Sequence, residues 1–149
     1  MKNFILFILA VVLAACSFSG NSEFARNHQK WQEANIPHYR FELNIGCFCA
    51  FRSRMPLTIE VQNGEIASMT GPDGVAIPTT DSNYEYFSRF ATIDHLFSEL
   101  EADLAGEADE VTVSYEATYG YPIQISIDFI KEAVDDELGL TVSGFEALP

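Results

Sequence analysis

Alternation of apolar and polar residues, the signature of strands with one buried face, recurs through most of this chain. The dipeptide Asn63-Gly64 separates two of these stretches, and it is the strongest short hairpin signal because both turn residues take a positive φ. One side of each stretch is polar, which favours an antiparallel sheet with a single covered face. We expect strands at residues 38–45, 57–62, 65–70, 111–116, 123–129 and 140–145.

Two helices are expected beside these strands. The first runs from Glu23 to about Asn35, and the second begins after the N-cap residue Thr92 and ends at Gly106. Residues 78–91 show no period and predict a long loop. The order of elements predicts an α+β fold, a single two-layer domain with a mainly antiparallel sheet of about five to six strands and two helices on one face.

The beginning of the chain indicates export. Lys2 precedes an apolar run over residues 4–13, which is shorter than the roughly 20 residues that span a bilayer. Leu13-Ala14-Ala15-Cys16 resembles the lipobox of bacterial lipoproteins. That resemblance implies a signal peptide over 1–15, diacylglycerol and a further acyl chain such as palmitate on Cys16, a tether over 16–22 and one globular domain over 23–149.

The same resemblance implies a location. Ser17 beside the lipid-bearing Cys16 is similar to the signal for the outer membrane, so we expect a protein anchored in the cell envelope and facing the periplasm. The expected partners are the membrane, through the N-terminal lipid, and an envelope protein.

The chain is strongly acidic. Its 8 Lys and Arg residues against 22 Asp and Glu residues give a formal net charge of −14. Loss of Lys2 with the signal peptide changes the net charge to −15, because no acidic residue precedes Glu23. This field repels phosphate backbones, so nucleic acid is excluded as an expected partner.

Cys47 and Cys49 remain once Cys16 is lipidated. Residues i and i+2 of a flat strand lie about 6.6–6.8 Å apart, at the upper limit of disulfide Cα separations of about 4.4–6.8 Å. A disulfide therefore needs a backbone bend, which Gly46 allows. A structural bridge or two buried thiols is one interpretation, and a redox-active or metal-binding pair is the alternative.

Two loops carry other candidate site residues. Asp128 with Asp135-Asp136-Glu137 offers oxygen ligands for calcium, although a solvated acidic loop has the same composition. Tyr119 and Tyr121 flank Gly120 and predict either a recognition loop or simple hairpin chemistry.

No catalytic motif accompanies the three histidines, His28, His38 and His95, which we expect at the surface without a catalytic role. No catalytic residue and no cofactor is predicted.

An ordered set of motifs completes the sequence pattern. Cys47-x-Cys49, then Tyr119-Gly120-Tyr121-Pro122, then Asp135-Asp136-Glu137 look like a bacterial family of secreted and lipid-anchored proteins known only as a domain of unknown function. The resemblance implies one envelope-exposed domain and assigns no site. The sequence predicts a lipid-anchored, non-enzymatic binding or interaction module. The alternatives are a periplasmic thiol-disulfide redox protein that uses Cys47 and Cys49, and a calcium-binding envelope protein.

Overall fold

The computed structural model describes residues 22–149. The expected signal peptide, the lipid-bearing Cys16 and all of the tether before residue 22 lie outside the described residues. Within the described part of the chain, no helix has the length and apolar character needed to cross a membrane.

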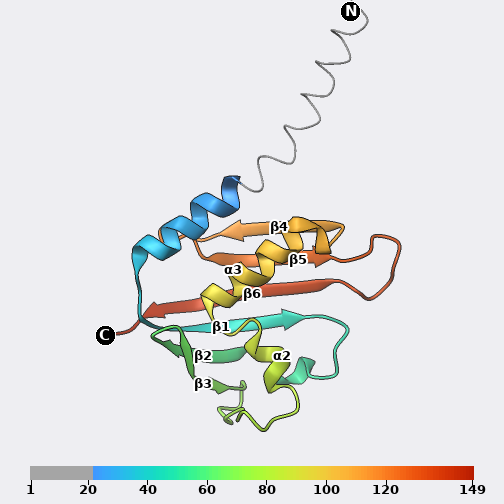
Figure 1. Cartoon of the computed structure of the whole chain (residues 1–149). Helices are drawn as coiled ribbons and strands as arrows, with labels where there is room; N and C mark the ends of the chain where they lie inside the picture. Colours follow the sequence, from blue (N-terminus) through green and yellow to red (C-terminus); the bar gives the residue numbers. More distant parts are fainter. Residues whose placement is uncertain (1–21) are drawn as a thin grey trace, which may run out of the picture.

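Six strands form one antiparallel sheet in the order β3-β2-β1-β6-β5-β4, which confirms the α+β prediction (Figure 1). The two central strands are β1 and β6, which are far apart in the sequence. Because β6 pairs with β1 on one side and with β5 on the other, it joins the β1–β3 half of the sheet to the β4–β5 half. The strands are β1 (His38–Gly46), β2 (Leu57–Gln62), β3 (Glu65–Thr70), β4 (Glu110–Tyr115), β5 (Pro122–Asp128) and β6 (Leu138–Ala147).

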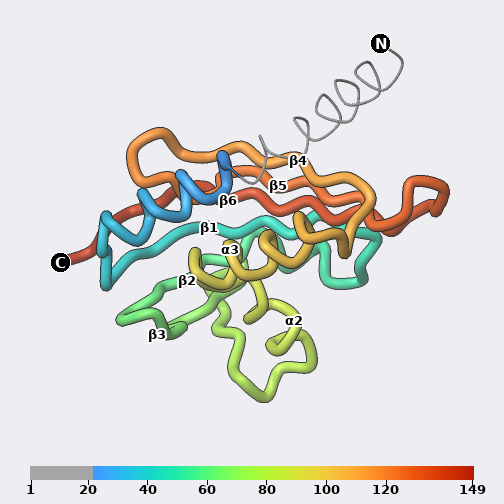
Figure 2. Tube along the Cα trace, turned by 45° about the horizontal axis from the view of Figure 1, so that its top comes forward, coloured from blue at the N-terminus to red at the C-terminus, as the bar shows by residue number. Residues whose placement is uncertain are grey.

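Two helices cover one face of this sheet (Figure 2). One extends over residues 22–34 and the other is α3 (Ile93–Ala102), whose N-cap Thr92 accepts a hydrogen bond from the His95 backbone N–H at 3.0 Å. The chain then continues into a wider, π-type turn, η2 (Asp103–Glu107), and leaves the helical path at Gly106, where φ is 112°. The predicted second helix and its N-cap are confirmed, but the α-helix ends at Ala102 and the π-type turn continues the path to Gly106.

A short helix, α2 (Tyr84–Ser88), lies within the segment that was expected to be a loop. That prediction was wrong for these residues because α2 is held by burial of Phe87 and the following Phe90, at 0% and 2% exposure, rather than by a local period. A one-turn 3-10 helix, η1 (Arg52–Arg54), lies in the connection between β1 and β2.

The core lies between the sheet and α3. Side chains of β1 alternate between buried and exposed, as the sequence predicted, and the buried set meets the apolar stripe of α3. Full burial of one such side chain stabilises the fold by about 1.5–3 kcal/mol. The buried residues that the two elements contribute to this core are Tyr39, Phe41, Leu43 and Ile45 of β1 and Ile93, Leu96, Phe97 and Leu100 of α3.

Candidate functional site

A disulfide joins Cys47 to Cys49 directly after β1. The S–S distance is 1.98 Å, and the two Cα atoms lie 5.2 Å apart, closer than the roughly 6.6–6.8 Å of a flat strand. The backbone therefore bends after Gly46, as the spacing required. The side chain between the two cysteines, Phe48, is 85% exposed.

A cavity of about 280 Å³ lies beside this disulfide, and we call it the acidic cavity. The loops that follow β1 and β5 lie together at this end of the sheet, on the right in Figure 1. The cavity is lined by Cys47, Phe48 and Cys49; by Tyr86, Arg89 and Phe90; by Glu99, Asp103 and Glu107; and by Phe129, Asp135, Asp136, Glu137 and Leu138.

Among residues 22–149, six carboxylates and a single basic side chain line the acidic cavity. The basic residue, Arg89, is already paired with Glu99. Neither α3 nor η2 has a basic residue in its last turn, although the negative end of the helix dipole favours one there. The potential in the acidic cavity is therefore negative from both side chains and backbone.

Asp103 is the buried member of this group. It is 8% exposed, and within the described residues its carboxylate makes no hydrogen bond and no ion pair. Burial raises the pKa of Asp103, and the nearby charges of Glu99 and Glu107 raise it further, while Arg89 lowers it. A partly desolvated carboxylate that lies among like charges without an ion-pair partner is costly, which is the condition that a cationic ligand would relieve.

Asp136 fixes the loop that forms the opposite wall. Its Oδ2 atom accepts a hydrogen bond from the Ile130 backbone N–H at 2.8 Å, while its Oδ1 atom is buried and has no partner in the described part of the chain. Asp109 Oδ2 accepts a second bond from the Lys131 backbone N–H at 3.1 Å. These contacts hold the β5–β6 loop against the cavity.

The predicted calcium ligands lie along this loop and at the end of β5. Burial raises the pKa of Asp128, and Asp136 and Glu137 add to that effect. Residues 22–149 contain no group of three or more His, Cys, Asp or Glu side chains arranged to hold a metal ion. Calcium binding by Asp128, Asp135, Asp136 and Glu137 stays a prediction without supporting geometry.

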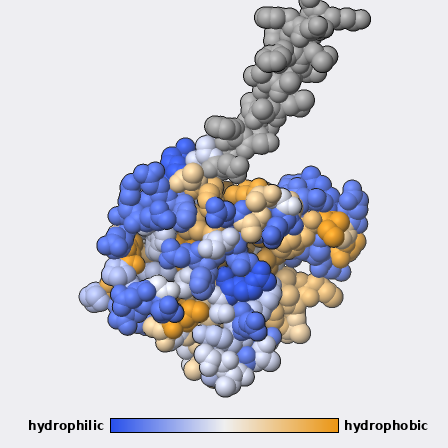
Figure 3. Space-filling view, in the orientation of Figure 1, coloured by the Kyte–Doolittle hydropathy of each residue, from blue (hydrophilic) through white to orange (hydrophobic). Residues whose placement is uncertain are grey.

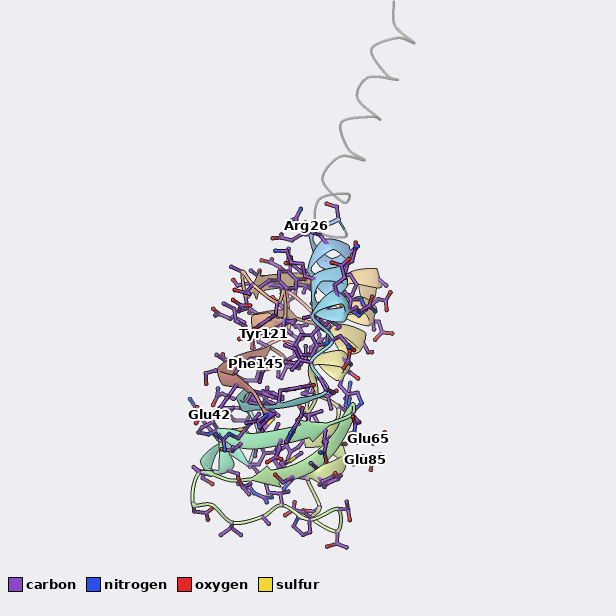
Figure 4. The ribbon with its side chains drawn as sticks, turned by 90° about the vertical axis from the view of Figure 1, so that its left-hand side faces the viewer. Arg26, Glu42, Glu65, Glu85, Tyr121 and Phe145 are labelled. Carbon is purple, nitrogen blue, oxygen red and sulfur yellow. A yellow bond between two sulfur atoms is a disulfide. The ribbon has the colours of Figure 1, made fainter. Side chains whose placement is uncertain are left out.

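The two tyrosines of the predicted recognition loop lie at the other end of the sheet. Tyr121 is 8% exposed, and its ring stacks on Phe145 with the centroids 4.6 Å apart (Figure 4). Tyr119 is half-buried with its centroid 6.0 Å from that of Phe145. Between them, a Cβ on Gly120 would lie 2.5 Å from the Asn27 carbonyl oxygen, so the turn packs directly on the helix over residues 22–34.

None of the three histidines is among the described residues that line the acidic cavity. His28 stacks on Phe97 with centroids 4.5 Å apart, and His95 Nδ1 lies 2.8 Å from the Ser88 carbonyl oxygen. His38 bridges Glu60 at 2.8 Å and the Pro149 carbonyl oxygen at 3.0 Å, and these hydrogen bonds raise its pKa.

The sequence interpretation missed the helical carboxylates of the acidic cavity. Glu99, Asp103 and Glu107 recur every four residues, a spacing that predicts one helix face, although the helical path ends at Gly106 before Glu107. No basic residue accompanies them in the last turns. That four-residue spacing, visible in the sequence, could have indicated a cluster of carboxylates at this position. The contribution of Arg89 and Tyr86 depends on α2, which the sequence did not indicate.

Comparison with known proteins assigns the domain. Residues 23–147 match the model of a family of unknown function, DUF6174. The chain belongs to this family. DUF6174 thus covers nearly all of the described domain, including the acidic cavity and the aromatic residues at the opposite end of the sheet. No curated protein and no solved structure matches the chain.

Proposed function

We propose that this DUF6174 protein is a lipid-anchored protein of the cell envelope, and that its domain is a non-enzymatic binding module whose binding site is the acidic cavity. Asp103 is the observation that carries the second part: the residue is 8% exposed, its carboxylate has no partner in the described part of the chain, and it lines a cavity rich in like charge. Such an arrangement costs stability in the free protein and is relieved when a positively charged group enters.

The anchor is supported by the sequence Leu13-Ala14-Ala15-Cys16 and by Ser17 after it. One acyl chain alone gives marginal membrane binding, so the proposal includes both diacylglycerol and a further acyl chain on Cys16. The expected site is the periplasmic side of the outer membrane. There the domain would meet envelope proteins and small solutes.

The surroundings of the disulfide favour binding over redox catalysis. Reactive cysteines lie in electropositive surroundings that stabilise the thiolate. Cys47 and Cys49 instead share a cavity with six carboxylates, which oppose a thiolate at either sulfur. We therefore prefer the binding module to the thiol-disulfide enzyme, and we expect a reduction potential below about −300 mV, as for structural disulfides.

Site-specific photo-crosslinking in the native envelope tests the binding function. A photoreactive residue at Phe48, on the rim of the acidic cavity, is compared with one at Val75, which is 63% exposed and lies elsewhere. We expect a crosslinked product from position 48 that is absent from position 75 and is lost when Asp103→Asn is added. Identical products from both positions, or products indifferent to Asp103→Asn, would contradict the proposal.

Intact-mass measurement of the native product tests the anchor. The expected species begins at Cys16 and carries the mass of the lipid, and Cys16→Ser should release the protein from the membrane fraction. An unmodified start, or cleavage further along the chain, would contradict lipid anchoring.

A further inference from the structure

We infer that the acidic cavity takes an organic cation, an ammonium or guanidinium group on a short apolar stem. This inference rests on the proposed function in using the same cavity, and it adds the chemical class of the ligand. Two sources carry that chemistry, a lysine or arginine side chain of a protein and a free polyamine or alkylguanidine.

The charge of the cavity requires a cation. Asp103 is 8% exposed in the cavity wall and has no hydrogen-bonding partner in the described part of the chain, and the charges of Glu99 and Glu107 lie near it. Arg89, the one basic residue among the described residues of the cavity, is paired with Glu99, so Asp103 has no ion pair of its own there. A charge-assisted hydrogen bond from a ligand to Asp103 would gain the energy that the free protein lacks.

The walls favour an organic cation over a metal ion. Tyr86, Phe90 and Phe129 line the cavity together with the carboxylates, and aromatic faces attract ammonium and guanidinium groups. The cavity already contains one such contact, because the Arg89 guanidinium carbon lies 5.4 Å from the centroid of the Phe90 ring. Although six carboxylates line the cavity, the described residues include no group of three or more His, Cys, Asp or Glu side chains placed to hold a metal ion.

The size and rim of the cavity limit the stem. A volume of about 280 Å³ is at the lower edge of small-molecule sites, which span roughly 300–1,000 Å³, and suits a ligand the size of a single side chain. Exposed apolar residues stand on the two neighbouring loops, with Phe48 85%, Ile130 55% and Val134 84% exposed. In Figure 3, hydrophobic residues lie among hydrophilic ones at this right-hand edge of the molecule. This rim would contact the residues on either side of a peptide-borne cation.

Isothermal titration of the full-length processed protein in lipid nanodiscs tests the inference. The probes are agmatine, spermidine, calcium chloride, and a short Leu-Arg-Leu peptide with blocked ends. The cavity variant is Asp103→Asn, and the matched control is Glu65→Gln, which removes one negative charge from an exposed position on β3 (Figure 4). Glu107→Gln is a second cavity variant at an exposed position, so the test does not depend on one substitution.

We expect saturable binding of an organic cation that weakens about tenfold or more in Asp103→Asn, weakens in Glu107→Gln and is unchanged in Glu65→Gln. Tighter binding of the peptide, with the gain lost in Phe48→Ser, identifies a protein source; tighter binding of agmatine or spermidine identifies a free cation. Absence of saturable organic-cation binding, calcium binding that displaces the organic probes, or equal weakening in Glu65→Gln would overturn the inference. If crosslinking at Phe48 still depends on Asp103 in that case, the binding function stands and only the ligand class fails.

Discussion

The two ends of the sheet differ in whether their buried polar side chains have hydrogen-bonding partners. At the aromatic end, formed by Trp31, Tyr39, Tyr121 and Phe145, Trp31 Nε1 donates to Asp94 Oδ1 at 3.1 Å and Tyr39 Oη accepts from the Ile93 backbone N–H at 3.1 Å. At the cavity end, Asp103 and the Oδ1 atom of Asp136 have no partner within the described residues.

The contrast separates residues that stabilise the fold from residues for which we propose a ligand. Aromatic pairs with centroids 4.6–6.2 Å apart link the helix over residues 22–34 to the sheet at the aromatic end. At the cavity end, like charges gather at the negative end of a helix, where they oppose folding. Groups that cost stability and persist in a folded domain indicate a functional site.

The largest expected difference between the ends concerns their aromatic side chains. Trp31→Ala should lower the free energy of unfolding by about 3–5 kcal/mol, since the ring is 5% exposed and its loss leaves a cavity. Phe48→Ala at the cavity end should change it by less than about 0.5 kcal/mol, because that ring is 85% exposed. Urea denaturation of the two variants measures both values, and similar losses would contradict the division of roles.

The next effect concerns the close approach of the Tyr119–Tyr121 turn to the helix over residues 22–34. Gly120→Ala should destabilise by about 2–3 kcal/mol, because φ is 79° and the added Cβ meets the Asn27 carbonyl oxygen at 2.5 Å. Gly64→Ala is the matched control, with φ at 82° and nothing within 4 Å, and should cost only about 1 kcal/mol. Equal losses in thermal denaturation would mean that the helix does not pack on this turn.

At the cavity end, by contrast, we expect a substitution that increases the stability of the fold. Asp103→Asn should raise the free energy of unfolding at pH 7 by about 0.5–1 kcal/mol, because it removes a partly desolvated charge that lies near two other carboxylates, while it weakens cation binding. The groups that face Asp103 are Glu99 and Glu107, which raise its pKa beyond the effect of burial, and Arg89, which lowers it.

The pH dependence of this gain follows from the raised pKa. The folded wild type holds the Asp103 proton more tightly than the unfolded chain does, so acid stabilises the wild type relative to the variant. The advantage of Asp103→Asn should therefore be full above the folded pKa and vanish below the unfolded value of 3.8. A variant that is less stable than wild type at pH 7 would contradict the account of this site.

The smallest effect is at His38, at the aromatic end of β1. Its hydrogen bonds to Glu60 and the Pro149 carbonyl raise its pKa above 6.5, so its contribution to stability is present below pH 6.5 and is lost as pH rises through the folded value. An NMR titration should give a pKa above 6.5, and Glu60→Gln should lower it. Glu65→Gln on β3, which is separated from β1 by β2, should leave the pKa of His38 unchanged.

Local periodicity carried the prediction of the sheet and of α3. The alternation through Tyr39, Phe41 and Leu43 places side chains on two faces whatever the rest of the chain does. Asn63 and Gly64 take the expected positive φ values of 53° and 82°, so the hairpin was also predictable. The sequence also predicted that a disulfide between Cys47 and Cys49 requires a bend of the backbone, because the Cα–Cα distance involved depends on only three consecutive residues.

The acidic cavity could be predicted only in part. Its walls come from segments near positions 47, 89, 103 and 136, and only the packing of α2, η2 and the β5–β6 loop brings them together. The four-residue spacing of Glu99, Asp103 and Glu107 was visible in the sequence, but burial of Asp103 depends on the tertiary fold. Likewise, the residues around Tyr121 in the sequence do not indicate that its ring packs on Phe145, because that contact joins segments that are distant in the sequence.

Chemical-shift mapping tests the central contrast most directly. Amide resonances of the full-length processed protein in nanodiscs are recorded during titration with agmatine. The account predicts shifts that saturate at residues 47–49, 103–107 and 129–138, while residues 119–121 and 145 stay unchanged. Shifts that never saturate, that spread evenly over acidic surface residues, or that centre on the aromatic end would contradict it.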